Sequence, residues 1–116
     1  MELKNSLIII HSMNTTIENI HKNLQVPMPK EEIFTTLLNH KNIKIEFISS
    51  NSIKNGALYI QEEDEWVILL EGEATLEVEQ TAHTLKSGDY LFIPAQVEHR
   101  VLFTNKKTLW LAVHIF

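Results

Sequence analysis

Five side chains in the second half of the sequence have types and spacing that could do chemistry: Tyr59, Gln61, Glu65, His99 and His114. Tyr59, Gln61 and Glu65 share one parity, so all three face the same way if the acidic residues between them form a turn between two strands. A carboxylate in an apolar interior is costly unless it meets a cation, a metal or hydrogen-bond donors. Glu65 is therefore either an inward site residue or one more charge in a solvated acidic turn.

His99 and His114 are the histidines that could join Glu65. His99 has the parity of the apolar residues that follow it, although its charged neighbours are also typical of a surface position. His114 lies in the apolar segment WLAVHIF, where a histidine is more often a core or interface group than a ligand. If both point inward, they form with Glu65 a two-histidine, one-carboxylate set suited to Fe(II), Mn, Ni or Zn, with Gln61 as a weak oxygen donor.

Tyr59 and Gln61 allow two interpretations each. Tyr59 could be an acid or base at the mouth of a barrel, or a strand aromatic whose hydroxyl points outward. Gln61 could line a ligand pocket, or it could hydrogen-bond Glu65 or Tyr59 in a polar network that needs no ion. We take Tyr59 and Glu65 as catalytic candidates and Tyr59 and Gln61 as candidate pocket residues.

Strands must position these residues, because the pattern from Asn42 onward has a period of two. Many short strands at this spacing, with no helix between them, indicate an antiparallel sandwich or barrel. The predicted strands are IKIEFIS (43–49), EWVILLEG (65–72), EATLEVEQ (73–80), AHTLK (82–86), YLFIP (90–94), HRVLF (99–103) and TLWLAVHIF (108–116).

Two of these strands, EWVILLEG and TLWLAVHIF, are apolar on both faces. A strand of that kind has to be covered on both sides. One cover is the inside of the barrel, and the other is an N-terminal helix or the sheet of a second subunit. We therefore expect a homodimer.

We divide the chain into residues 1–41, an N-terminal arm with a short helix that packs on the barrel, and 42–116, the barrel itself. In the arm we predict a short strand over 7–10, a short helix over 15–24, and a further helix over 30–39. The apolar face of that last helix comprises Ile33, Phe34, Leu37 and Leu38.

The composition limits the classes of partner and the compartment. The chain has 116 residues, a net charge of −5 and no cysteine. It has no cluster of Lys and Arg to replace the counterions of a nucleic acid, so we expect no nucleic-acid partner. The apolar run of four residues over 7–10 is too short for a signal peptide or a membrane span. We therefore expect a cytoplasmic protein with no membrane partner.

Two fragments carry a resemblance to a known family. EWVILLEG is a Glu, six residues and a Gly, and GDYLFIPAQVEH is a Gly, five residues, a Pro and a His five positions further on. Together and in this order they resemble the two motifs of the cupin superfamily, over about residues 42–116. The helix over 30–39, YxQ before DEWV, and WLAVH resemble small single-domain bacterial cupins of unassigned function. The resemblance implies an all-β, cupin-type double-stranded β-helix (jelly-roll-like) barrel, here with a short N-terminal helical segment.

The resemblance also implies a site, often with one divalent metal, in the barrel mouth. Glu65 takes the position of the family's metal-binding Glu and His99 that of the second-motif His. The two first-motif histidines are replaced by Tyr59 and Gln61. Three further departures from the motifs are Ile53, Gln96 and Phe103.

Three hypotheses of function follow. The first is a cupin module that binds a small molecule in the barrel mouth, through a divalent metal such as Zn, Fe, Mn or Ni or without one. The second is a cupin-type enzyme, an oxygenase or isomerase, that uses Glu65 and His99. The third is a metal-free structural or accessory dimer. The sequence does not decide between an enzyme and a binding protein, and it does not identify the ligand.

Overall fold

The structure, a computed structural model, describes residues 15–22 and 24–116 and consists of eight β-strands joined by turns and loops. The described residues contain no helix, and therefore none that could span a membrane. The strands are β1 (Glu31–His40), β2 (Ile43–Asn51), β3 (Asp64–Glu71), β4 (Glu73–Val78), β5 (Thr81–Lys86), β6 (Tyr90–Ile93), β7 (His99–Thr104) and β8 (Thr108–Ile115). All seven strands predicted from Ile43 onward are present as β2 to β8.

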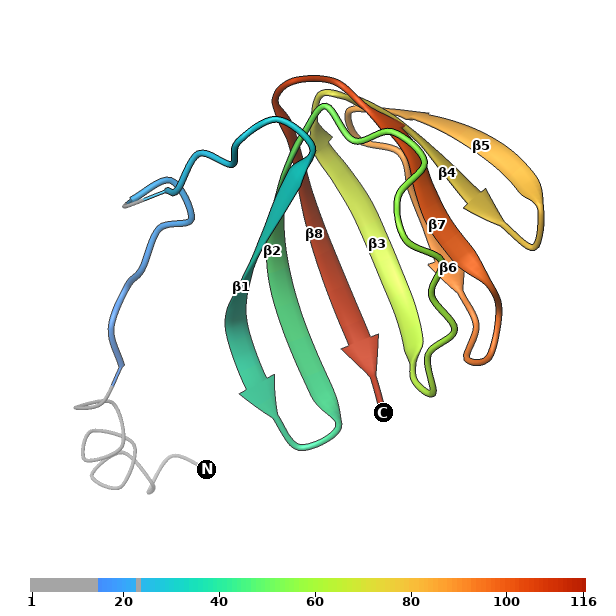
Figure 1. The fold of residues 1–116 in the computed structure, drawn as a ribbon. Helices are drawn as coiled ribbons and strands as arrows, with labels where there is room; N and C mark the ends of the chain where they lie inside the picture. Colours follow the sequence, from blue (N-terminus) through green and yellow to red (C-terminus); the bar gives the residue numbers. More distant parts are fainter. Residues whose placement is uncertain (1–14, 23) are drawn as a thin grey trace.

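The strands form two antiparallel sheets (Figure 1). The larger sheet has the strand order β1-β2-β8-β3-β6 and the smaller one β5-β4-β7. β8 is the last strand in the chain, yet it lies at the centre of the larger sheet between β2 and β3. The arrangement agrees with the predicted all-β, cupin-type barrel.

The helix predicted over residues 30–39 is wrong, because this segment is the edge strand β1. It pairs antiparallel with β2 along its length, with a β-bulge between Thr36 and Leu38. The bulge adds one residue, so Ile33 and Leu38 share the outer face although strict alternation would separate them. The apolar residues therefore lose their period of two and imitate the stripe of a helix. The strands of the barrel begin at Glu31, earlier than the boundary that the sequence suggested.

The segment before β1 also differs from the prediction. Residues 15–22 have no regular secondary structure apart from a turn, in which the amide of Lys22 donates to the carbonyl of Asn19 at 3.1 Å. The short helix predicted over 15–24 is not formed in the described residues. The strand predicted over 7–10 lies outside them.

The core lies between the two sheets and consists of inward residues from both. Its most deeply buried members are Leu69 on β3, Ala74 on β4, Ile93 on β6 and Ala112 on β8. Apolar residues of β2, β3, β4, β5, β6 and β8 are buried here, which is the main stabilising contribution of such a barrel.

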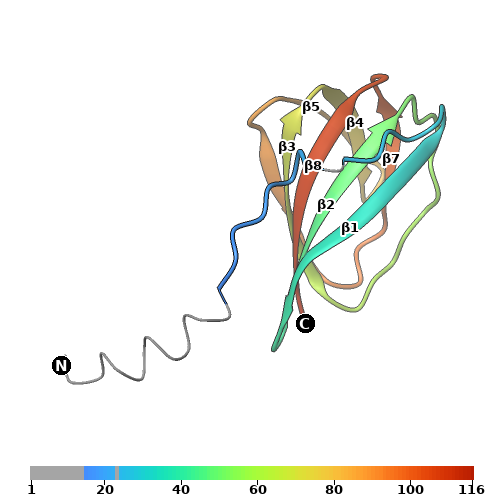
Figure 2. The same ribbon diagram turned by 90° about the vertical axis from the view of Figure 1, so that its left-hand side faces the viewer.

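The outer face of the larger sheet is apolar too, as predicted for β3. Trp66 points outward and its ring lies 5.3 Å from that of Tyr90. Tyr90 and Phe92 on β6 remain 65% and 52% exposed. At the other end of this face, Leu24 of the N-terminal segment and Phe47 of β2 line one shallow hollow, where Figure 2 shows the segment passing beside the sheet.

The connection from β2 to β3, residues 52–63, runs along β7 without forming a regular strand. Backbone hydrogen bonds link Tyr59 and His99 in both directions, at 2.8 and 3.0 Å. The amide of Gly56 donates to the carbonyl of Val101 at 2.8 Å. A Cβ at Gly56 would lie 2.9 Å from the same carbonyl oxygen, so the close approach favours glycine.

Candidate functional site

Glu65 lies on the inner face of β3, near the start of the strand. It pairs in register with His114 on β8 and with Ile93 on β6, and it is 8% exposed. Glu62, in the acidic run before it, is exposed. Of the two alternatives that the sequence left open, the structure has the inward carboxylate.

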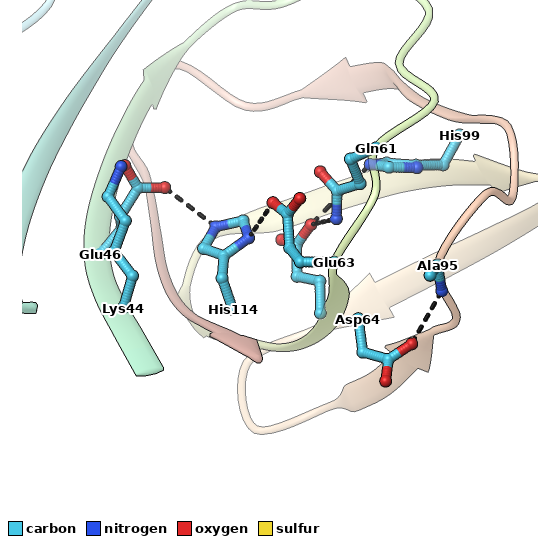
Figure 3. Close-up of polar contacts among 9 residues, drawn as sticks. Lys44, Glu46, Gln61, Glu63, Asp64, Ala95, His99 and His114 are labelled. Carbon is cyan, nitrogen blue, oxygen red and sulfur yellow. Dashed lines mark hydrogen bonds and ion pairs between the residues drawn. The ribbon is translucent and has the colours of Figure 1, made fainter. Parts of the chain in front are cut away.

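Gln61 supplies the hydrogen-bond donor nearest to this carboxylate. Its side-chain amide donates from Nε2 to Oε1 of Glu65 at 2.9 Å (Figure 3). Its backbone carbonyl accepts from the amide of Gln96 at 2.8 Å, which holds the connection against the loop before β7. Gln61 therefore forms the polar contact that the sequence offered as one of its two roles.

His99, the first residue of β7, is 7% exposed and turns one ring nitrogen toward Glu65. Its Nδ1 lies 3.1 Å from the carbonyl oxygen of Val97. A carbonyl can only accept, so Nδ1 carries the proton of this bond and Nε2 of the neutral ring has a free lone pair. Nε2 lies 3.8 Å from Oε1 of Glu65, too far for a hydrogen bond. His99 is thus a buried residue whose Nε2 makes no hydrogen bond with the described residues and whose side chain lines a cavity, described below.

Tyr59 lies at the edge of the same group. Its ring centroid is 6.1 Å from that of His99, with the two planes at 30°. The residue is 51% exposed. Tyr59 is thus placed where a bound molecule could meet its ring.

His114 lies on the same wall, but its ring is engaged elsewhere (Figure 3). Nε2 lies 3.0 Å from Oε1 of Glu46 on β2, and Nδ1 lies 2.9 Å from Oε2 of Glu63. The Glu63 contact is an ion-pair contact without good hydrogen-bond alignment, so Nδ1 has no formal hydrogen-bond partner. Lys44 lies 3.4 Å from the other oxygen of Glu46. His114 is therefore a link between β2 and the β2–β3 connection.

A cavity of about 210 Å³ lies between the two sheets and joins these residues. All five side chains singled out from the sequence line it. Glu32, Glu46 and Arg100 complete its polar wall, and the apolar wall includes Phe34, Val67, Leu76 and Trp110.

Glu32 and Glu46 are site residues that sequence reasoning missed. Glu32 falls within the helix that was predicted over 30–39, whereas in the structure it lines the cavity from β1. Ser50 donates from Oγ to Oε2 of Glu32 at 2.6 Å, and Trp110 donates from Nε1 to Oγ of Ser50 at 3.1 Å. Burial raises the pKa of Glu32 above its usual value, and the hydrogen bond from Ser50 partly opposes this rise. The parity of Glu46 with the inward Ile48 was a signal that could have located it.

The donor set does not fit the divalent metal that the cupin resemblance implies. The metal site of the family has four donors: two first-motif histidines, the metal-binding Glu and the second-motif His. In this chain only Glu65 and His99 retain the residue type of their motif position. The Glu65 oxygen that faces His99 already accepts the amide of Gln61. Both nitrogens of His114 face carboxylates. Within residues 15–22 and 24–116, no three His, Cys, Asp or Glu side chains are grouped to hold a metal ion. The metal site stays a prediction, with an experiment given below.

Comparisons with known proteins agree with the fold and the motifs. The model of the cupin domain family matches residues 55–114, which is more than half of the chain. No curated protein matches.

Several solved structures are similar to this chain. One, from Ralstonia eutropha, carries the provisional description mannose-6-phosphate isomerase. It is 37% identical, with 87% of this chain and 98% of that chain covered and a TM-score of 0.76. A cupin superfamily protein from Desulfitobacterium hafniense is 16% identical, with 88% and 93% covered and a TM-score of 0.71. KdgF from Halomonas sp. is 14% identical, with 87% and 94% covered and a TM-score of 0.72. The last two show similarity of fold alone.

Proposed function

Because this chain belongs to the cupin superfamily, we propose that it binds a small organic molecule in the cavity between its sheets, through side chains rather than through a resident metal. The observation that carries the proposal is Nε2 of His99. It is a ring nitrogen that has no hydrogen-bond partner among the described residues, and it belongs to a side chain that lines a cavity beside Glu65. A polar group without a protein partner on the wall of a largely apolar cavity is typical of the groups that orient a bound ligand.

A fragment screen by 1H–15N NMR tests this proposal. Ligands that enter the cavity are expected to shift the amides of Tyr59, Gln61, Glu65 and His99 and to leave β5, on the edge of the smaller sheet, unchanged. A cavity-filling variant, Val67→Phe, is expected to abolish these shifts while it keeps the folded spectrum, because the new ring occupies the space that Val67 lines. If no fragment shifts these amides, the accessory-dimer hypothesis replaces the binding proposal.

A second candidate function is acid–base catalysis of the isomerase type. It is favoured by the arrangement of Glu65 and His99, a carboxylate and an imidazole 3.8 Å apart on the cavity wall, with Tyr59 at the edge. A substrate proton could be removed by one group and returned by the other. The description of the relative from Ralstonia eutropha makes mannose 6-phosphate the first compound to assay.

The enzyme candidate is tested by following isomerisation with 1H NMR. Turnover that is lost in Glu65→Gln and in His99→Gln, with melting temperatures retained, would support it. Tyr59→Phe distinguishes the role of the hydroxyl: a loss of turnover without a loss of stability assigns an acid–base role to Tyr59. Unchanged turnover assigns Tyr59 to packing. The oxygenase alternative needs a redox metal, and the donor set described above does not favour one.

A further inference from the structure

The charges of the cavity indicate which class of molecule it binds. We propose that the cavity selects a ligand with an organic ammonium group and that the carboxylate of Glu32 is the anchor for that cation. The inference rests on the proposed binding function and names its ligand class. It also predicts that phosphates and carboxylates are poor ligands.

Glu32 is held in place by one of its two oxygens. Oε2 accepts the hydroxyl of Ser50 at 2.6 Å, and Ser50 in turn accepts the buried indole N–H of Trp110 at 3.1 Å. Oε1 has no hydrogen-bond or ion-pair partner within residues 15–22 and 24–116, and the side chain lines the cavity. The carboxylate is therefore oriented by the protein but not neutralised by it.

The burial of Glu32 also supports its role as an anchor for a cation. Burial raises its pKa, and the only opposing influence is the hydroxyl of Ser50, without a neighbouring cation. A partly buried carboxylate in this condition has lost part of its hydration and has no counterion among the described residues, which is unfavourable. An ammonium group of a ligand would restore the missing charge and could donate to Oε1.

The Lys and Arg side chains near the cavity, and His114, already have partners. Arg100 donates from Nε to Oε1 of Glu77 at 3.1 Å. Lys44 and His114 both lie against Glu46, at 3.4 and 3.0 Å. An anionic ligand would therefore find no unpaired Lys or Arg in the described part of the wall.

Anions would also meet negative charge at both ends of the cavity. Glu32 pairs in register with Ser50, which itself pairs with Thr108 at the start of β8. Glu65 pairs with His114, near the end of β8. The cavity thus has two carboxylates without a strong cationic partner, separated by apolar side chains. A phosphate group placed between them would be repelled by both.

Aromatic side chains of the wall suit a cation as well. Phe34 and Trp110 line the part of the cavity next to Glu32, and Tyr59 lines the mouth. An ammonium group over an aromatic face is attracted by the quadrupole of the ring, most strongly where water is excluded. The expected ligand is a small alkyl- or arylalkylammonium compound whose apolar part fills the rest of the cavity.

Three probes of similar shape test the ligand class by NMR titration at pH 7. They are benzylamine, which carries an ammonium group, benzyl alcohol, which is neutral, and benzoate, which is an anion. We expect benzylamine to bind about tenfold more tightly than benzyl alcohol, as one desolvated ion pair or cation–π contact would give. We expect benzoate to bind more weakly than either.

Variants of Glu32 connect this preference to the proposed anchor. In Glu32→Gln the preference for benzylamine should fall to about twofold or less, because the ion pair is lost. Benzyl alcohol should bind as before, which also reports that the cavity is intact. The matched control Glu79→Gln removes a charge from an exposed turn and should keep the full preference. If Glu32→Gln binds neither probe, Glu32→Asp is tested in its place. A preference of Glu32→Asp for benzylamine over benzyl alcohol supports the anchor, and the absence of this preference overturns it.

The outcomes separate this inference from the proposal on which it rests. Equal or tighter binding of benzyl alcohol or benzoate overturns the ammonium class and leaves the small-molecule cavity standing. A preference for benzylamine that persists in Glu32→Gln overturns the assignment of Glu32. If none of the three probes binds while other fragments shift the cavity amides, the inference fails and the proposed function survives. If no fragment binds at all, both fail.

Discussion

One hydrogen bond to the main chain determines which ring nitrogen of His99 can act as an acceptor. The carbonyl of Val97 accepts a hydrogen bond from Nδ1–H, and the lone pair of Nε2 is left without a hydrogen bond on the cavity side. Metal-binding histidines are commonly oriented in this way by a bond from the second nitrogen. The same orientation makes a good hydrogen-bond acceptor for a ligand. The residues around Nε2 decide between these roles, and Gln61 and Tyr59 do not offer the imidazoles that a metal would require.

Metal analysis of protein purified without chelator tests that conclusion. We expect clearly less than one equivalent of Zn, Fe, Mn or Ni, and no rise in melting temperature when these ions are added, because a metal that bound the native state would stabilise it. One equivalent of metal in the wild type that disappears in His99→Ala would contradict our reading and restore the predicted metal site.

Glu32 is expected to make stability depend on pH with a definite sign. Its folded-state pKa is raised above the usual 4.5, so the folded protein binds more protons than the unfolded chain in that range. The contribution of Glu32 is therefore most favourable below 4.5 and is lost as the pH rises through the folded-state pKa. Glu32→Gln should gain stability over the wild type as the pH is raised from 4 to 7. Urea unfolding at both pH values measures this. The control Glu79→Gln should show no such gain, and a pH-independent difference for Glu32→Gln would contradict the prediction.

At the scale of elements, the connection 52–63 is held from two sides. Backbone bonds attach Tyr59 to β7, and the contact between Glu63 and His114 attaches the connection to β8. Asp64, which follows directly, accepts the amide of Ala95 at 2.8 Å (Figure 3). The segment that carries Tyr59 and Gln61 is thus fixed in position by buried polar contacts.

Replacing His114 should loosen this connection more than the rest of the barrel. In His114→Gln we expect the amide of Tyr59 to exchange with solvent about tenfold faster, since a buried polar contact contributes about 1–2 kcal/mol to local stability. Hydrogen–deuterium exchange by NMR measures this, with amides of β4 as an internal reference. Glu63→Gln should have a similar effect. Glu62→Gln, which alters an exposed neighbour, should have none. Equal acceleration in β4 would show global destabilisation instead.

The elements differ in how well the sequence predicted them, and β1 shows why. Strands with clean alternation, such as β4, were predicted because each residue's face follows from its parity. β1 was mistaken for a helix because its bulge breaks the alternation, and because pairing with β2 overrides local propensity. The site residues also differ in how well the sequence predicted them. Glu65 and His99 could be found from motif spacing, whereas the contact of His114 with Glu46 and Glu63 joins three separate elements and has no local signal.

For the whole molecule, the outer face of the larger sheet supports the proposal of a homodimer. Tyr90 and Phe92 are large aromatics that remain more than half exposed beside the partly buried Trp66. Exposed apolar patches of this kind are typical of interaction surfaces. The N-terminal segment approaches the other end of this face, at Phe47, and is not the helical cover that the sequence suggested.

Light scattering coupled to size exclusion tests the dimer. We expect a dimer for the wild type at micromolar concentration and a monomer for Phe92→Glu, because a buried carboxylate in an apolar interface costs several kcal/mol. A matched substitution on the smaller sheet, His83→Glu, should leave the dimer intact. A monomeric wild type would refute the homodimer.

The position of β8 has a consequence for the synthesis of the chain. Among the eight strands it is the last to leave the ribosome, yet Ile43 pairs with Ile115 and Asp64 pairs with the same residue from the other side. Until β8 arrives, β2 and β3 expose unpaired backbone groups along facing edges, a state that invites association with other chains. Such non-local pairing is also slow to form. A message truncated before Thr108 would therefore leave β2 and β3 unjoined, so the cavity between the sheets can form only after almost the entire sequence shown here has been translated.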